Sequence, residues 1–176
     1  MNTNKVNRLF FFRYPSPMGE IVLGATEKGL YGCWLDPDEA KAATIGLDCV
    51  SEANPFLDQA RAWLDAYFAG TALPEPPILD IQGTPFQKQV WALIGEIPYG
   101  KTASYGDLAV EIASERSISR MSAQAVGQAV GKNRICLFIP CHRVIAAGNK
   151  IGGFSAGIDR KIWLLEHEKD VVLNNG

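Results

Sequence analysis

A proline-rich break near the middle of the chain separates two stretches with different residue patterns. The segment "TALPEPPILDIQG" (71–83) carries three prolines, and prolines at this density are not compatible with the interior of a helix or a central strand. A chain of 176 residues is long enough for one domain or two small ones. We therefore interpret residues 73–83 as a linker between an N-terminal domain, residues 1–80, and a C-terminal domain, residues 84–170.

The residues before the break predict a small α/β domain. Aromatic and β-branched residues separated by turn signals predict three strands, at 8–14, 19–26 and 30–35. A weak helix is expected after Asp36 and a stronger one from Asn54, with Pro55 at its first position and Gly70 at its end. The helical spacing places a set of apolar and aromatic residues on one face: Phe56, Ala60, Trp63, Leu64 and Tyr67.

The residues after the break predict a mainly helical domain. Two capping boxes, Thr84 with Gln87 and Ser104 with Asp107, mark helix starts. A short helix rich in alanine and glycine is expected from Ser122 to Gly131. Two short helices joined by a turn indicate a helix-turn-helix arrangement, although the close packing of small-faced helices explains the pattern equally well.

The last part of the chain combines a buried run, a turn and a helix. The run "ICLFI" (135–139) is continuously apolar, so we expect it to be buried. The segment "AAGNKIGG" (146–153) reads as a turn or a wing. In the amphipathic segment "GIDRKIWLLEHEKD" (157–170), we expect Ile158, Ile162 and Leu165 to face inward.

The charge distribution is uneven. Residues 1–83 hold 6 Lys/Arg and 11 Asp/Glu, and residues 84–176 hold 11 and 8. The stretch from Arg116 to Ile158 contains six basic residues and no acidic one. Such a stretch favours contact with a polyanion such as DNA, although a solvated surface explains it as well.

The cysteines argue against a metal site. Four cysteines and two histidines are present without any CxxC pair, so we expect no metal. Because neither a signal peptide nor a membrane span is recognisable, we expect a cytoplasmic protein with reduced thiols. Cys33 and Cys49 are expected to pack as small hydrophobic residues.

Cys141 and His142 form the most reactive pair in the sequence. A thiol attacks as its thiolate, so it requires a nearby base, and a base requires an orienting partner. His142 is the adjacent base, and Glu166 and Glu168 are candidates to orient it. An isolated Cys-His dipeptide is more often structural than catalytic, so the surrounding sequence must decide between these two roles.

Those surroundings resemble one family. "IPCHRV" (139–144), "GFSAG" (153–157), "KIWLLEHE" (161–168) and "TPFQKQVWALIGEIPYGKTASYGDLA" (84–109) are similar to the O6-alkylguanine-DNA alkyltransferases. The resemblance is strong over residues 84–169, whereas the N-terminal half is similar only in its general residue pattern. It implies an RNase H-like α/β N-terminal domain with a small antiparallel sheet, followed by a mainly α, winged helix-turn-helix-like domain.

The resemblance implies roles for individual residues of the active site. Cys141 would accept the alkyl group, His142 would take its proton through water, and Glu168 would hold the imidazole. Tyr105 would rotate a phosphate of the target nucleotide and place its hydroxyl near the guanine. Asn133 would be the hinge between the recognition helix and the active-site segment.

The resemblance also implies how guanine and DNA would be held. The carbonyl groups of Cys141 and Val144 would accept from the guanine amine, and Ser155 would donate to O6, with Phe154 and Ala156 at the pocket wall. The helix from Ser122 to Gly131 would enter the minor groove, where a bulky side chain would hold it off the floor. The residues expected to contact DNA are Arg120, Ser122, Ala123, Gln124, Ala125, Gly127, Lys132 and Arg134.

The implied activity is direct-reversal DNA repair by a methylated-DNA–protein-cysteine methyltransferase that acts once. After nucleotide flipping in double-stranded DNA, a methyl or other alkyl group would move from O6 of guanine, and also from O4 of thymine, to the cysteine. We expect no cofactor and no membrane partner. We expect a monomer, nucleoid-associated in a prokaryote, and leave open cooperative binding along DNA.

Four positions depart from the family pattern. Gln124 stands where an arginine is frequent, which predicts weaker binding or weaker extrusion of the nucleotide. Asn133 is followed by Arg134 instead of proline, and Phe154 replaces a frequent tyrosine. Ala156 replaces a frequent glycine, which predicts poorer acceptance of bulky groups such as benzyl.

Three other functions remain as alternatives. A non-catalytic relative that binds alkylated bases would share the architecture, but its nucleophile is replaced. A winged-helix transcription regulator would explain the helix-turn-helix and the basic stretch without using Cys141 or Glu168. A cysteine hydrolase would require an oxyanion site and would turn over repeatedly.

Overall fold

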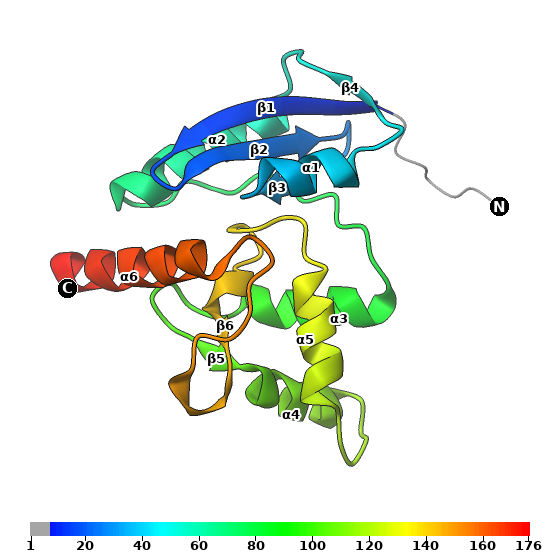
Figure 1. The fold of residues 1–176 in the computed structure, drawn as a ribbon, viewed down its shortest axis with the longest axis vertical. Helices are drawn as coiled ribbons and strands as arrows, with labels where there is room; N and C mark the ends of the chain where they lie inside the picture. The colour runs from blue at the N-terminus through cyan, green and yellow to red at the C-terminus, as the bar shows by residue number, and fades with distance from the viewer. Residues whose placement is uncertain (1–7) are drawn as a thin grey trace. The chain divides into compact units, whose positions relative to one another are not determined.

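The computed structural model describes residues 8–176, which form two compact units, residues 8–81 and 82–176. The first unit contains a four-stranded sheet in the order β3-β2-β1-β4 with two helices, and the second is mainly helical (Figure 1). The first unit's elements are β1 (Arg8–Ser16), β2 (Gly19–Ala25), β3 (Leu30–Trp34), α1 (Pro37–Ala43), β4 (Asp48–Val50) and α2 (Pro55–Ala69).

The sheet of the first unit is mixed, so the prediction of an antiparallel sheet is wrong in this detail. β1 pairs antiparallel with β2, and β2 with β3, but β4 runs parallel to β1. β4 has only three residues, which are too few to show the alternation of apolar and polar residues that identifies a strand in a sequence. Cys49 lies on this edge strand and is exposed, which corrects the expectation that it is buried, whereas Cys33 is buried as expected.

The two helices of this unit lie on opposite faces of the sheet. Alternate residues of a strand point to opposite faces. Leu9 of β1 packs with Trp34 and with Ala40 of α1, whereas Phe12 lies under the guanidinium of Arg61 from α2. The caps predicted for α2 are confirmed, since Asn54 accepts from the backbone of residues 56 and 57 and Gly70 ends the helix in the left-handed conformation.

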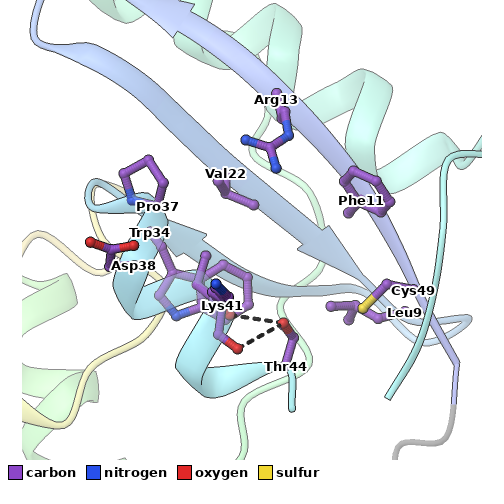
Figure 2. Close-up of a pocket in the computed structure, with 11 residues that line it drawn as sticks. Leu9, Phe11, Arg13, Val22, Trp34, Pro37, Asp38, Lys41, Thr44 and Cys49 are labelled. Carbon is purple, nitrogen blue, oxygen red and sulfur yellow. Dashed lines mark hydrogen bonds between the residues drawn. The ribbon is translucent and has the colours of Figure 1, made fainter. Parts of the chain in front are cut away.

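On the face that carries α1, the ring of Trp34 lies across β2 and β3. A Cβ atom at Gly32 would lie 2.1 Å from this ring, so the close approach requires glycine. The seven-residue α1 covers only part of this face. Beside it is a cavity of about 390 Å³, whose lining includes Phe11, Arg13 and Lys41 (Figure 2).

The proline-rich segment is not wholly a linker. Leu30 of β3 donates its backbone N–H to Ile78 O at 2.8 Å and accepts from Asp80 N at 2.8 Å. Leu79 thereby forms a parallel bridge with Leu30. The prolines end before this point, and residues 78–80 form hydrogen bonds with backbone groups on the otherwise unpaired edge of β3.

The second unit groups α3, α4 and α5 with a two-stranded pair and a long last helix. Thr84 and Ser104 form the two predicted capping boxes, and Ser122 caps α5. The indole Nε1 of Trp91 in α3 donates to Ala129 O of α5 at 2.9 Å, which joins these helices. The elements are α3 (Pro85–Gly95), β5 (Ala103–Ser104), α4 (Tyr105–Glu115), α5 (Ala123–Gly131), η1 (Cys141–Arg143), β6 (Val144–Ile145), η2 (Ala147–Asn149) and α6 (Ile158–Asn175).

The inner face of α6 differs from the predicted one. Ile158 is 51% exposed, and Ile162 and Leu165 are only half-buried. The buried residues are instead Lys161, Leu164 and Glu168. Two of these are charged, because this face of the helix meets backbone carbonyl groups and an arginine that need partners. Apolar periodicity does not detect such a face.

Candidate active site

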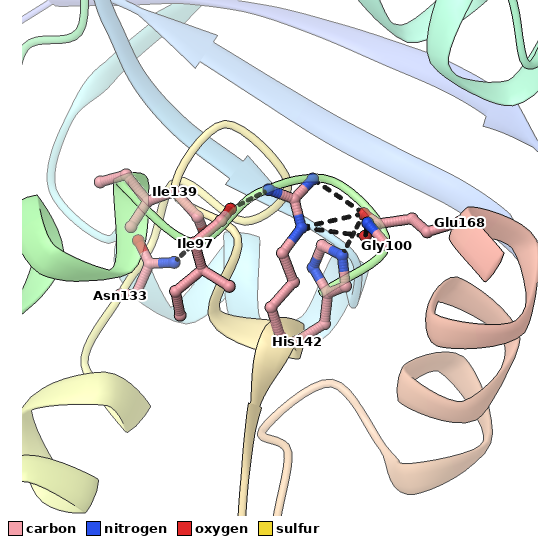
Figure 3. Close-up of polar contacts among 7 residues, drawn as sticks. Ile97, Gly100, Asn133, Ile139, His142 and Glu168 are labelled. Carbon is pink, nitrogen blue, oxygen red and sulfur yellow. Dashed lines mark hydrogen bonds and ion pairs between the residues drawn. The ribbon is translucent and has the colours of Figure 1, made fainter. Parts of the chain in front are cut away.

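A tight loop held by Asn133 carries the chain from α5 to Cys141. The Asn133 amide donates from Nδ2 to Ile139 O at 2.9 Å (Figure 3), and its Oδ1 accepts from Ile135 N at 2.9 Å. Leu137, between them, has φ of 72°, which reverses the chain direction. The apolar run is buried as predicted, apart from the half-buried Phe138. Asn133 therefore fixes the shape of the segment that ends at the cysteine.

Glu168 of α6 is the centre of a buried polar network (Figure 3). Its Oε1 lies 2.6 Å from His142 Nε2, and its Oε2 accepts from Arg143 Nε at 2.9 Å and from Gly100 N at 3.0 Å. Arg143 also donates from Nη1 to Ile97 O at 2.7 Å. The side chains of His142 and Glu168 are 0% and 1% exposed, so water screens this network little.

This network determines which imidazole nitrogen of His142 can act as a base. Burial would raise the pKa of Glu168, but His142 and Arg143 outweigh it and lower the pKa to about 2. An ionised carboxylate only accepts hydrogen bonds, so His142 Nε2 carries the proton. Burial lowers the pKa of His142, which leaves the imidazole neutral at neutral pH. Among residues 8–176, Nδ1 has no hydrogen-bond partner, so its lone pair is able to accept a proton.

Groups around Cys141 favour its thiolate. The Cys136 thiol, whose Sγ lies 3.9 Å from the Cys141 Sγ, lowers the pKa of Cys141. Burial opposes this effect, while Asn133 and the positive charge of Lys161 act in the same direction as Cys136. Burial itself lowers the pKa of Lys161 to about 8. At neutral pH Lys161 still carries its charge, so the cysteine sits in a positive field.

Cys141 lies at a cavity of about 310 Å³, within the range of small-molecule sites. Burial and the nearby cysteine raise the pKa of the Tyr105 hydroxyl, which therefore remains protonated and able to donate. Of the residues predicted to hold guanine, Val144 and Ala156 are buried outside the lining. The lining consists of Tyr105, Gly127, Val130, Gly131, Cys141, Gly153, Phe154 and Ser155.

The residues predicted to contact DNA lie on or beside α5. Gln124 is exposed at the start of the helix, and Gly127 lies where the helix meets the cavity. A Cβ atom at Gly127 would lie 3.6 Å from the Tyr105 ring, an ordinary contact. Exposed positions are Arg120, Ser122, Ala123, Gln124 and Lys132, and half-buried ones are Ala125, Gly127 and Arg134.

Three residues of the site were not predicted. Arg143, read from the sequence as part of a basic surface stretch, is 7% exposed and paired with Glu168. Lys161 is fully buried and donates to Val144 O at 2.6 Å and Gly153 O at 3.1 Å. Val144 O, predicted to accept from guanine, thus already accepts from this lysine. The third unpredicted residue is Cys136, which lies beside Cys141. The only sign of it in the sequence was the presence of two cysteines five residues apart.

Residues 8–176 contain neither a cluster of metal ligands nor a membrane-spanning helix. No group of three or more histidine, cysteine, aspartate or glutamate side chains is arranged to hold a metal ion. No helix in this range is sufficiently long and apolar to cross a membrane.

Family models match both units. Residues 85–170 match the DNA binding domain of 6-O-methylguanine DNA methyltransferase, and residues 10–74 match its ribonuclease-like domain. A methylated-DNA–protein-cysteine methyltransferase from Methanosarcina acetivorans is 36% identical over 91% of this chain and 98% of its own length. One from Mycobacterium leprae is 36% identical over 91% and 92%.

Solved structures agree with the family models. The chain is similar to Mycobacterium tuberculosis OGT in complex with DNA, with a TM-score of 0.76 and 36% identity over 92% of this chain and 94% of that one. The Mycobacterium tuberculosis O6-methylguanine methyltransferase gives a TM-score of 0.73 at 35% identity, covering 92% and 93%. The predicted fold class, with its ribonuclease-like and DNA-binding domains, is confirmed apart from the parallel strand β4. The chain belongs to the 6-O-methylguanine DNA methyltransferase family.

Proposed function

We propose that this protein repairs DNA by moving a methyl or other alkyl group from O6 of guanine to Sγ of Cys141. One observation carries the proposal: a cysteine at a cavity is followed by a histidine that a buried glutamate holds at 2.6 Å. A structural Cys-His pair has no need of a buried carboxylate that leaves one imidazole nitrogen available. Membership of the methyltransferase family supports the same reaction.

DNA binding is assigned to α5. Its exposed side chains near the start are small or uncharged, such as Ala123 and Gln124, so the helix suits a narrow groove. Arg120 and Lys132, exposed at its two ends, would contact phosphates without reading sequence. Gln124 would take the space of the flipped nucleotide and hydrogen-bond the unpaired base.

The proton of the Cys141 thiol leaves before or during attack. We assign His142 Nδ1 as its acceptor, through a bridging water, because Nε2 is held by Glu168. The imidazolium that forms is stabilised by the ionised Glu168. Arg143 in turn keeps that carboxylate ionised and in place.

The transfer forms one bond and breaks one bond. The Cys141 sulfur supplies an electron pair to the alkyl carbon, and the pair of the carbon–oxygen bond remains on O6 of guanine. Hydrogen-bond donors stabilise this developing charge, and Ser155 and the protonated Tyr105 at the cavity are assigned to that role. The product is a thioether, which water does not cleave, so each molecule would act once.

The test is methyl transfer from a duplex oligonucleotide that contains O6-methylguanine. Intact mass spectrometry should show one added methyl group, mapped to Cys141, and none in Cys141→Ser. Cys49→Ser, which removes an exposed cysteine of the first unit, is the matched control and should be methylated normally. A methyl group on another residue would contradict the assignment.

The alternative functions predict different results when the protein is given damaged and undamaged oligonucleotides. A binding protein for alkylated bases would retain the oligonucleotide without gaining mass, and a transcription regulator would prefer one undamaged sequence. A cysteine hydrolase would release its product and act again.

A second oligonucleotide with O4-methylthymine tests the broader substrate range that we include in the proposal. We place the protein on DNA in the cytoplasm, acting as a monomer without a cofactor.

A further inference from the structure

Two buried thiols, not one, lie at the candidate acceptor site. Cys136 is 2% exposed and Cys141 is 5% exposed, and their Sγ atoms are 3.9 Å apart, within hydrogen-bonding distance for sulfur. The loop that Asn133 closes through its hydrogen bonds to residues 135 and 139 contains Cys136, and at its end Cys141 N donates to Ile139 O at 2.7 Å. The pair is therefore a fixed feature of this loop.

We propose that Cys136 is a further residue of the transfer reaction, whose S–H donates a hydrogen bond to the Cys141 thiolate and holds that sulfur ready for attack. This inference depends on the proposed function, since it gives a role in the same step. The proton of Cys141 leaves through His142, and Cys136 keeps its own proton throughout. No oxidation and no bond between the two sulfurs is involved.

The surroundings make even a weak donor effective. A thiol is a weak hydrogen-bond donor, but a hydrogen bond to an ionised acceptor is about twice as strong as one between neutral groups. Both sulfurs are buried, so little water competes with this contact and the low local dielectric strengthens it. In the neutral pair the contact runs from the Cys141 thiol to Cys136, but once Cys141 has lost its proton only the Cys136 S–H can donate. A hydrogen bond to the thiolate agrees with the lowered pKa of Cys141, to which Cys136 makes the largest contribution.

Other titratable groups also face the acceptor sulfur, and any pH profile includes them. They are Tyr105 of α4, whose pKa is raised; Lys161 of α6, whose pKa is about 8; and His142, whose pKa is lowered. Glu168 acts through His142. Because these groups are unchanged in variants of Cys136, the difference between two profiles isolates the contribution of that thiol.

The experiment compares Cys136→Ala, which lacks a donor, with Cys136→Ser, which keeps one. Single-turnover methyl transfer is measured against pH with a reductant present. At neutral pH we expect Cys136→Ala to be about three- to tenfold slower, because the pKa of the Cys141 thiol rises and less of it is ionised. At alkaline pH, above the pKa of the thiol, its rate should converge on that of the wild type. Cys136→Ser should stay within about twofold throughout.

Two controls separate this role from packing and from failure of the proposed function. Cys33→Ala, a buried cysteine of the first unit, should leave the profile unchanged. Thiolate absorbance in the ultraviolet, taken as the difference from Cys141→Ser, reports the pKa of Cys141 without DNA. The inference is overturned if Cys136→Ala keeps the wild-type thiol pKa, or if Cys136→Ser is as slow as Cys136→Ala at every pH.

Discussion

Replacing Glu168 by glutamine tests the buried network that orients His142. The variant keeps the shape of the side chain but leaves the buried charge of Arg143 without a counter-ion. The pKa of Glu168 falls from 4.5 to about 2 on folding, which corresponds to about 3 kcal/mol of stability. Breaking a buried ion pair independently costs about 3–5 kcal/mol. Both values predict that Glu168→Gln lowers the free energy of unfolding of the second unit by about 3 kcal/mol.

The pH dependence of this loss has a definite sign. Because folding lowers the pKa of Glu168, its stabilisation is complete above the unfolded pKa near 4.5 and is lost as the pH falls through about 2. The wild type and Glu168→Gln should therefore converge in stability as the pH falls across this window. Above it, the difference between them should stay constant.

Urea unfolding read by pulsed hydrogen exchange is the suitable assay, because it reports residues 82–176 separately from the first unit. Glu166→Gln, an exposed change two residues earlier on α6, is the control and should alter stability by less than about 0.5 kcal/mol. A loss below about 1 kcal/mol at neutral pH for Glu168→Gln, or a difference that does not shrink in acid, would contradict the role assigned to the Glu168 carboxylate.

Three further substitutions test the site and its approach to DNA. Gln124→Arg should tighten binding to damaged duplex and speed repair, measured by fluorescence anisotropy and single-turnover kinetics; unchanged values would contradict the assigned role. Ala156 is buried next to Ser155 of the cavity lining, so Ala156→Gly should loosen this wall from behind and raise the benzyl transfer rate relative to methyl; equal rates for both groups in the wild type would argue against it. Lys161→Met leaves the Val144 and Gly153 carbonyl groups without a hydrogen-bond donor and should lower the free energy of unfolding in urea by about 1–3 kcal/mol. An unchanged free energy of unfolding would show that these contacts are dispensable.

Local signals in the sequence predicted local structure well. The starts of α2, α3 and α4 follow from side chains at Asn54, Thr84 and Ser104, each of which bonds to backbone within three residues. Such signals need no knowledge of the rest of the fold. For the same reason the first three strands and the alanine-rich helix were predicted close to their observed bounds.

Features that depend on distant partners were missed. The pairing of residue 79 with Leu30 and the parallel strand β4 depend on edges that only the folded sheet presents. The buried face of α6 carries Lys161 and Glu168, whose partners lie 8 to 68 residues earlier in the chain. Burial of such groups follows from partners rather than from hydrophobicity. The Cys-His-Glu set was predicted through family resemblance, and the geometry adds Arg143 and Cys136 to it.

In the proposed reaction, the Cys141 sulfur keeps the alkyl group that it takes. To test this, a known amount of protein is mixed with a large excess of duplex containing O6-methylguanine, and the restored guanines are counted. We expect a plateau at one restored guanine per active protein molecule, with the methyl group on Cys141. Continued repair beyond that ratio, or repair that leaves no methyl group on the sulfur, would contradict it.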